Sequence, residues 1–214
     1  MDFGVYDYEI ELPGLINPDA YAEREPWKIH TVDPFQYFPK EISAALLAKT
    51  IRAVEPRAGK IDYDVAGTLS GNWFEQDTNW YDGINQRKYW EGHLSIAPHQ
   101  IDPSLWRIGI GFLDVDDNNF IIAGEDDPVR VGTSSGPVTY ELHRYMVYIP
   151  EKPEKQWWRE SYEGEVFGVK VHSDLVGTVL LDLSEQGQLK VEVFLGQSSG
   201  EVKEFTEKAR IYQR

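Results

Sequence analysis

The sequence predicts an all-β fold, an antiparallel β-barrel of about eight to ten strands preceded by an irregular arm and one short helix. Short segments that alternate apolar and polar residues, separated by turn residues, run from Lys60 to the end of the chain. Hydrophobic residues make up 41% of the 214 residues, with 7 Trp, 12 Tyr and 9 Phe, enough for one sizeable core. We therefore divide the chain into an arm with its helix, residues 1–60, and a barrel domain, residues 61–214.

The arm lacks the strand pattern. Residues 13–39 contain five prolines among polar and aromatic residues, which predicts an extended segment that lies on a larger body. A helix is expected over residues 40–54, because Ala44, Leu47, Ala48 and Ile51 follow the spacing of one helical face. Pro56 is expected to end this run.

The remaining chain is expected to form strands near 62–76, 86–97, 105–113, 119–123, 138–149, 164–172, 176–183, 188–195 and 202–213. Within 105–113, the residues Trp106, Ile108, Ile110 and Phe112 alternate with their neighbours, as in a strand with one apolar face. A turn at 185–188 joins two alternating segments into a hairpin. Strands at this spacing are typical of a sandwich or a barrel.

Charge and composition exclude several classes of partner. The net charge of −15 repels phosphate backbones and anionic lipid surfaces, so we expect no nucleic-acid binding, whereas cations and neutral ligands stay open. No run of about 18 apolar residues is present, so we expect no membrane insertion. The absence of cysteine removes disulfides and thiolate chemistry. The N-terminal residues MDFGVYDYEIELPG have no basic start and no apolar run, so they predict no signal peptide and leave the compartment open.

Both ends of the strand region carry a familiar pattern. Leu69-Ser70-Gly71-Asn72-Trp73-Phe74 resembles the Gly-x-Trp signature that opens barrels of the calycin superfamily, the lipocalins and fatty-acid-binding proteins. Lys208-Ala209-Arg210-Ile211-Tyr212-Gln213-Arg214 resembles the Arg-x-Tyr ending of the fatty-acid-binding branch. The arm and the first strand also resemble those of bacterial proteins without a known activity. The preceding helix and the lack of the middle lipocalin motif depart from the superfamily pattern.

The resemblance implies an up-and-down barrel in which the first strand lies beside the last. It also implies that the guanidinium of Arg210 stacks on the indole of Trp73, and that Arg210 and Tyr212 hold the carboxylate of an acidic ligand. The alternative is that Arg210 only braces Trp73 and binds no ligand.

A loop from Asp114 to Glu125 suggests a calcium site. Asp114, Asp116, Asn118 and Glu125 occupy the first, third, fifth and twelfth places of the spacing by which an EF-hand loop wraps calcium. Asn119 stands where glycine is usual, and the flanks are predicted strands. An ordinary solvated hairpin loop is the alternative.

Polar residues at alternate positions of two predicted strands suggest acid–base chemistry. Glu91 and His93 with Tyr89, and Glu141 and His143 with Tyr145, would form a polar wall inside a barrel, and a His beside a carboxylate can transfer protons near neutral pH. The alternative is that these residues lie on the solvent-exposed outer face of the sheet. Metal binding by His93, His143 and His172 is a further possibility.

Aromatic residues near loops suggest a surface for sugars or flat ligands; these are Trp80, Tyr81, Tyr89, Trp90, Trp157 and Trp158.

These patterns leave three hypotheses about function. The first is a carrier of a small hydrophobic or acidic ligand in a lipocalin-like cavity. The second is a barrel enzyme, a hydrolase, isomerase or lyase, that uses the His, Glu and Tyr side chains as acids and bases. The third is a non-catalytic module that binds carbohydrate or protein.

Overall fold

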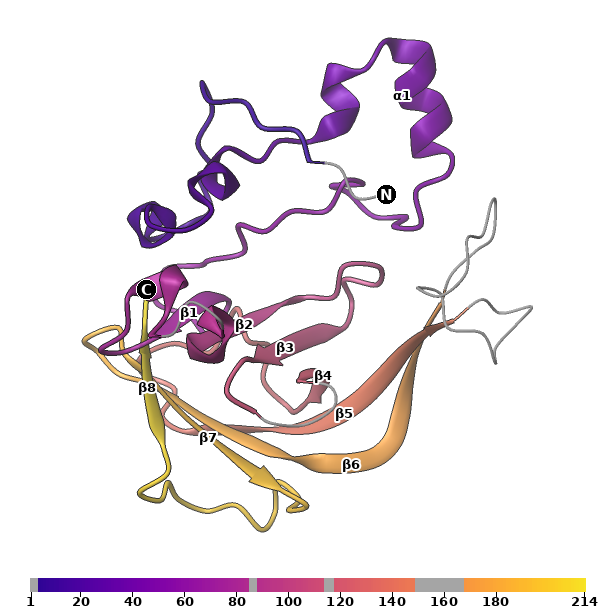
Figure 1. The fold of residues 1–214 in the computed structure, drawn as a ribbon. Coiled ribbons are helices and arrows are strands. Elements are labelled where there is room, and N and C mark those ends of the chain that lie inside the picture. The colour runs from indigo at the N-terminus through magenta and orange to yellow at the C-terminus, as the bar shows by residue number, and fades with distance from the viewer. Residues whose placement is uncertain (1–3, 85–87, 114–117, 149–167) are drawn as a thin grey trace.

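A computed structural model describes residues 4–84, 88–113, 118–148 and 168–214. It confirms the predicted all-β fold, a closed antiparallel up-and-down barrel of eight strands (Figure 1). The strands are β1 (Gly71–Glu75), β2 (His93–Pro98), β3 (Trp106–Ile110), β4 (Asn119–Ala123), β5 (Val138–Tyr148), β6 (Gly168–Leu183), β7 (Leu189–Leu195) and β8 (Arg210–Gln213).

The barrel closes between its first and last strands. β1 pairs with β2 on one side and with β8 on the other, where Phe74 lies opposite Gln213 and Glu75 opposite Tyr212. Each of the other strands pairs with its neighbours in sequence. This arrangement is consistent with a calycin-like fold. In the part of the chain that is described, no helix is long and apolar enough to cross a bilayer.

The inward faces of the strands pack into one core. The alternation predicted for β3 is confirmed, because Ile108 and Ile110 are buried in this core. The predicted hairpin is also confirmed, since the apolar faces of β6 and β7 meet in the same cluster. The core consists of Leu69, Trp73, Leu94, Ile96, Ile108, Ile110, Phe120, Ile122, Val131, Tyr140, Leu142, Val179, Leu181, Leu183, Leu189, Val191 and Tyr212. Side chains rather than an open lumen therefore occupy the centre of the barrel.

Two predicted strands are in fact one. Residues 164–172 and 176–183 were expected to be separate strands, and 164–167 lie outside the described residues. Instead, β6 runs unbroken from Gly168 to Leu183 and bends sharply along its length (Figure 1). The bend coincides with register shifts against β5 on both sides of His143. Gly177 permits a close approach to β7, because a Cβ there would lie 2.4 Å from the backbone oxygen of Phe194. The bend carries the outer halves of β5 and β6 away from the barrel.

Other predicted boundaries were too wide. The strands expected at 62–76, 86–97 and 202–213 are shorter, as β1, β2 and β8, because turns, irregular segments and a 3-10 helix, Tyr89–Gly92, occupy the rest of these ranges where they are described. The helix α1 spans only Lys40–Leu47. Its last turn tightens, with the amides of Lys49 and Thr50 bonded to the carbonyls of Leu46 and Leu47, and the guanidinium of Arg57 donates to the carbonyls of Leu47 and Thr50 at this end.

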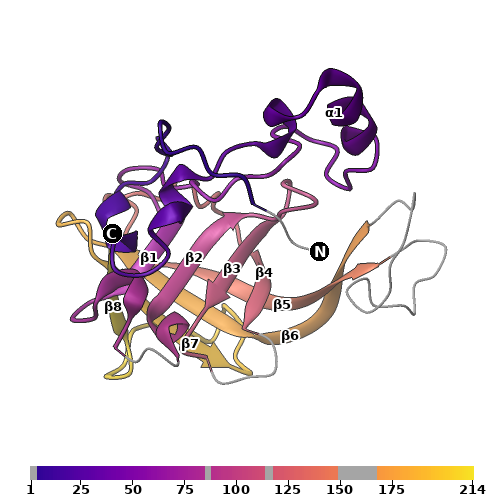
Figure 2. The ribbon, with the colours of Figure 1, turned by 45° about the horizontal axis from the view of Figure 1, so that its top comes forward.

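The arm lies across one end and one outer face of the barrel (Figures 1 and 2). Three short 3-10 helices, Pro18–Tyr21, Pro26–His30 and Pro34–Tyr37, lead into α1. Leu15, Ala20 and Tyr21 pack with Phe74, which points outward from β1. In contrast, α1 stands away from the barrel and has no buried residue.

Candidate functional site

The arginine that stacks on Trp73 is Arg214, and the prediction of Arg210 is wrong. The guanidinium carbon of Arg214 lies 3.9 Å from the centroid of the Trp73 ring. Its nitrogens donate hydrogen bonds to the backbone oxygens of Ser70, Val65 and Thr68. Burial lowers the pKa of Arg214 to about 10, which leaves the group charged at neutral pH. The indole Nε1 of Trp73 donates to the carbonyl of Leu69 at 3.0 Å, so this end of the barrel is closed by a satisfied cluster.

Arg210 begins β8, four residues before Arg214. Its Nη1 donates to both carboxylate oxygens of Glu75 at 3.0 Å, and its guanidinium carbon lies 4.3 Å from the centroid of Phe112. Tyr212 is fully buried in the core, and burial raises its pKa. Its hydroxyl has no hydrogen-bond partner among the described residues. The proposed carboxylate grip of Arg210 and Tyr212 therefore remains a prediction, with Arg210 already held by Glu75.

His93 lies on the outer face of the barrel beneath the arm. Its Nε2 is 2.9 Å from the carbonyl oxygen of Tyr81, and its ring packs against Phe74, Tyr81 and Tyr89 at centroid distances of 5.5, 4.6 and 5.5 Å. Burial is the largest effect on the pKa of His93, which is lowered. Glu91 forms an exposed ion pair with Lys88 at 3.0 Å.

His143 lies three strands away from His93, because β3 and β4 separate β2 from β5. The two histidines therefore do not form the shared polar wall that was predicted. On β5, His143 Nε2 is 3.9 Å from a carboxylate oxygen of Glu141. The other oxygen of Glu141 accepts hydrogen bonds from the backbone and hydroxyl of Ser199, and these bonds lower the pKa of Glu141.

Tyr145 follows the register shift and contacts a different histidine. Its ring stands edge-on to the ring of His99 at a centroid distance of 5.0 Å. His172 is exposed on β6. The residues of the predicted polar wall therefore lie in separate places. His93 is beneath the arm, His143 is beside Glu141, and Tyr145 and His172 are on the outer parts of β5 and β6.

The predicted calcium loop falls partly outside the described residues. Asp114 and Asp116 are outside the described residues. Of the other two, Asn118 accepts a hydrogen bond from the side chain of Asn119, and Glu125 is exposed after β4. Within the described ranges, no group of three or more His, Cys, Asp or Glu side chains is arranged to hold a metal ion. The calcium site stays a prediction.

Several of the candidate aromatic residues join the arm to the barrel. Tyr81 packs on Tyr21 at a centroid distance of 4.9 Å, and Trp80 stands edge-on to Phe74 at 6.3 Å. Arg24 stacks on Tyr89 at 4.4 Å. Trp90 is 45% exposed. Trp157 and Trp158 lie outside the described residues.

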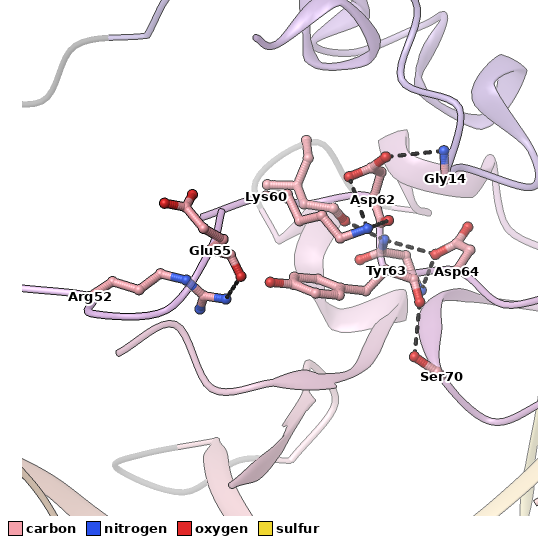
Figure 3. Close-up of polar contacts among 10 residues, drawn as sticks. Gly14, Arg52, Glu55, Lys60, Asp62, Tyr63, Asp64 and Ser70 are labelled. Carbon is pink, nitrogen blue, oxygen red and sulfur yellow. Dashed lines mark hydrogen bonds and ion pairs between the residues drawn. The ribbon is translucent and has the colours of Figure 1, made fainter. Parts of the chain in front are cut away.

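Carboxylates in the segment before β1 fasten the arm to the barrel (Figure 3). Asp62 is 6% exposed and accepts a hydrogen bond from the backbone of Gly14 at 3.0 Å. Asp64 accepts from the backbones of Ile16 at 3.0 Å and Asn72 at 2.7 Å. The two carboxylates thus tie the start of the arm to the first strand.

A buried arginine fastens the other end of the arm. Arg52, which is 6% exposed, donates to the carbonyl oxygens of Val54 and Glu55 in its own turn. It also donates to the carbonyl oxygens of His99 at 3.5 Å and Gln100 at 3.1 Å, beyond β2. The segment after α1 is therefore held against the rim of the barrel.

A groove of about 540 Å³ lies between these two attachments. We call it the arm groove; it is lined by Ile10, Leu12, Thr31, Val32, Asp33, Gln36, Tyr37, Pro56, Ala58, Gly59, Lys60, Ile61 and Gln100. Its lining is mostly apolar, and Ile10, Tyr37 and Ile61 are 43%, 47% and 40% exposed. Sequence reasoning missed this feature; the one available signal was apolar residues in a proline-rich segment without a regular period.

Comparisons with protein-family models, with curated proteins and with solved structures found no match to this chain.

Proposed function

We propose that this protein binds a small, mostly apolar ligand in the arm groove. The observation that carries the proposal is the groove itself, whose volume of about 540 Å³ and apolar lining are those of a small-molecule site. The polar side chains Asp33, Gln36, Lys60 and Gln100 in its lining are suited to orienting a polar end of the ligand.

The proposal keeps the predicted class of ligand and changes the location. Inward-facing side chains fill the barrel with one continuous core, which does not favour a lipocalin-like cavity at the centre. The arm groove instead leaves large apolar side chains partly open to solvent, where a ligand would cover them.

The other two hypotheses have less support. An enzyme that uses His93 and His143 together is disfavoured, since the two residues occupy separated strands and His93 is packed beneath the arm. A carbohydrate surface built on Trp80, Tyr81 and Tyr89 is disfavoured because Tyr81 packs against Tyr21 and Tyr89, and Trp80 packs against Phe74 of β1.

Titration with the neutral apolar fluorophore N-phenyl-1-naphthylamine tests the proposal. We expect saturable binding that Ile61→Glu weakens at least about tenfold, because a carboxylate in an apolar site loses its hydration without gaining a partner. Ile84→Glu is the matched control, since Ile84 is 80% exposed and lies outside the groove. Equal binding by both variants and the natural protein would remove the arm groove as the site.

A further inference from the structure

The last residues of β7 form a free sheet edge. β8 pairs with β7 only as far as Val191, which lies opposite Arg210, whereas β7 continues to Leu195. Between the two strands the chain runs as an irregular loop, residues 196–209, at the bottom of Figure 1. On its other edge β7 stays paired with β6 as far as Leu195. One side of residues 193–195 is therefore without a partner strand among the described elements.

The backbone groups of two residues point toward this free edge. The amide of Gly196 donates to the carbonyl of Val176 at 2.8 Å, so the even-numbered residues of β7 direct their backbone groups toward β6. Successive residues of a strand alternate between its two edges, so the N–H and C=O groups of Val193 and Leu195 face the side that β8 has left. Neither residue has a backbone hydrogen-bond partner on that side in the described part of the chain. Unpaired strand positions of this kind are a template for a further extended backbone.

A polar brace holds the loop out of the sheet. A longer β8 would place Lys208 opposite Val193 and Thr206 opposite Leu195. Instead, the carboxylate of Glu192, which is 4% exposed, accepts hydrogen bonds from the backbone amide of Thr206 at 2.6 Å and from its hydroxyl. The same hydroxyl accepts from the amide of Lys208 at 3.2 Å. The amides that would have continued the ladder are thus already bonded elsewhere.

A groove of about 720 Å³ lies where the ladder would have continued. We call it the β7 groove; residues 192–195 and 197 line one side, and residues 206–208 line the other. Leu195 is 50% exposed, and Val193 is partly buried against the barrel core. The β7 groove shares no lining residue with the arm groove.

We propose that the β7 groove binds an extended peptide segment of a partner protein, which adds a strand to the free edge of β7. Two residues of the peptide exchange backbone hydrogen bonds with Val193 and Leu195. Their side chains lie on the same face as those of Val193 and Leu195, so apolar side chains at these alternate positions cover Leu195. Basic residues between them suit a protein whose net charge is −15.

Amide NMR titration with the peptide acetyl-Lys-Val-Lys-Val-Lys-amide tests this inference. We expect saturable shifts of the amides of Val193 and Leu195. N-methylation of both valines of the peptide removes the N–H groups that face β7 and should weaken binding at least about tenfold. The matched control is N-methylation of the middle lysine of the peptide, whose N–H faces away, and it should change the affinity by less than about twofold. The two methylated peptides carry the same charge, so attraction by charge alone does not distinguish them.

A pair of variants tests the same contact from the protein side. Leu195→Pro removes the N–H that faces the groove, at a position where proline is tolerated because the edge is free. Leu195→Ala is the matched control, since it also removes the side chain but keeps the N–H. We expect Leu195→Pro to bind the peptide at least about fivefold more weakly than Leu195→Ala. Urea unfolding checks that both variants fold, and the methylated peptides decide the question if Leu195→Pro does not.

Four outcomes would overturn the inference. They are no saturable shift at millimolar peptide, shifts confined to residues outside the β7 groove, binding of the valine-methylated peptide as tight as that of the lysine-methylated one, and equal affinities of folded Leu195→Pro and Leu195→Ala. Ile61→Glu should leave peptide binding intact, because Ile61 lines only the arm groove. Failure of the arm-groove proposal is therefore distinguishable from failure of this one.

Discussion

Arg214 connects the last residue of the barrel to the turn that precedes its first strand. One guanidinium covers the indole of Trp73 and satisfies three backbone carbonyls in the 65–70 segment. Gly71 makes the approach possible, since its φ is +135° and a Cβ there would lie 2.6 Å from Arg214 Nη1. The closure of the barrel therefore depends on this pair of residues more than on Arg210.

Replacement of Arg214 by Ala should lower the free energy of unfolding by about 2–4 kcal/mol, because a cation–π contact and three hydrogen bonds from a charged group are lost. Arg210→Ala removes a partly exposed ion pair with Glu75 and should cost at most about 1 kcal/mol. Urea unfolding of both variants measures the difference. A larger loss for Arg210→Ala would contradict this assignment.

His99 is a buried histidine that the fold holds neutral. Its Nδ1 accepts hydrogen bonds from the backbones of Ile101 at 3.2 Å and Asp102 at 3.3 Å, which a protonated ring could not do. Burial, followed by the positive charge of Arg107, lowers the pKa of His99 to about 4. Because the folded pKa lies below the unfolded value of 6.5, the neutral ring stabilises the fold above that pH.

The stability due to His99 should therefore be lost as the pH falls from about 6.5 towards 4. His99→Asn keeps an acceptor oxygen and removes the titration, so the loss of unfolding free energy between pH 7 and pH 4.5 should be smaller in this variant than in the natural protein. His172→Asn, on an exposed histidine, is the control and should retain the full loss. Identical pH profiles for all three proteins would show that His99 does not titrate in this window.

The register of two strands explains why sequence reasoning chose the wrong arginine. The terminal motif correctly predicted an arginine against Trp73, but Arg210 and Arg214 share a face and the sequence alone does not align β8 with β1. In the observed register Phe74 lies opposite Gln213, so the next pair in this direction is Trp73 and Arg214. In the other direction, Arg210 lies past Glu75. The pairing of β1 with β8, which depends on tertiary structure, therefore decides which arginine stacks on Trp73.

Among the elements, the arm is held by one apolar cluster around Phe74 and by a few polar attachments, and the segment around α1 has only the polar ones. Its helix α1 has no buried residue, and the segment that follows α1 is held to the barrel rim through Arg52. The stability of this segment should therefore be local and lower than that of the barrel.

Removal of the Arg52 side chain should release this segment. In Arg52→Ala, we expect the amides of Ala48, Lys49 and Thr50 to exchange with deuterium at least about tenfold faster, while the barrel strands keep their protection. Lys49→Ala, which removes an exposed charge nearby, should exchange like the natural protein. Accelerated exchange of β2 and β3 instead would indicate that Arg52 supports the barrel as a whole.

Elements with a clear period were predictable, and those shaped by contacts at a distance were not. The alternation in β3 and in the β6–β7 hairpin identified their buried faces correctly. The continuity of β6 through its bend accompanies register shifts against β5, and the end of α1 is bonded by Arg57 from beyond the helix; no local pattern reveals either contact. The separation of His93 from His143 has the same origin, because parity along a strand does not say which strands are neighbours.

For the whole molecule, the central contrast is between a filled barrel and an open groove beside it. The strand pattern predicted the barrel and its apolar interior, but a ligand cavity inside it was inferred from the family resemblance alone. The arm groove arises where segments far apart in sequence, near residues 10, 32 and 60, meet without regular secondary structure. Such a meeting leaves no periodic signal in the sequence.

Methyl NMR of the isoleucine residues reports on ligand binding in the arm groove and in the barrel core in one spectrum. On titration with N-phenyl-1-naphthylamine, the account predicts shifts for Ile10 and Ile61 in the arm groove and none for Ile96, Ile108 and Ile110, which are at most 1% exposed in the core. Shifts confined to the three core isoleucines would contradict it and return the ligand to the centre of the barrel.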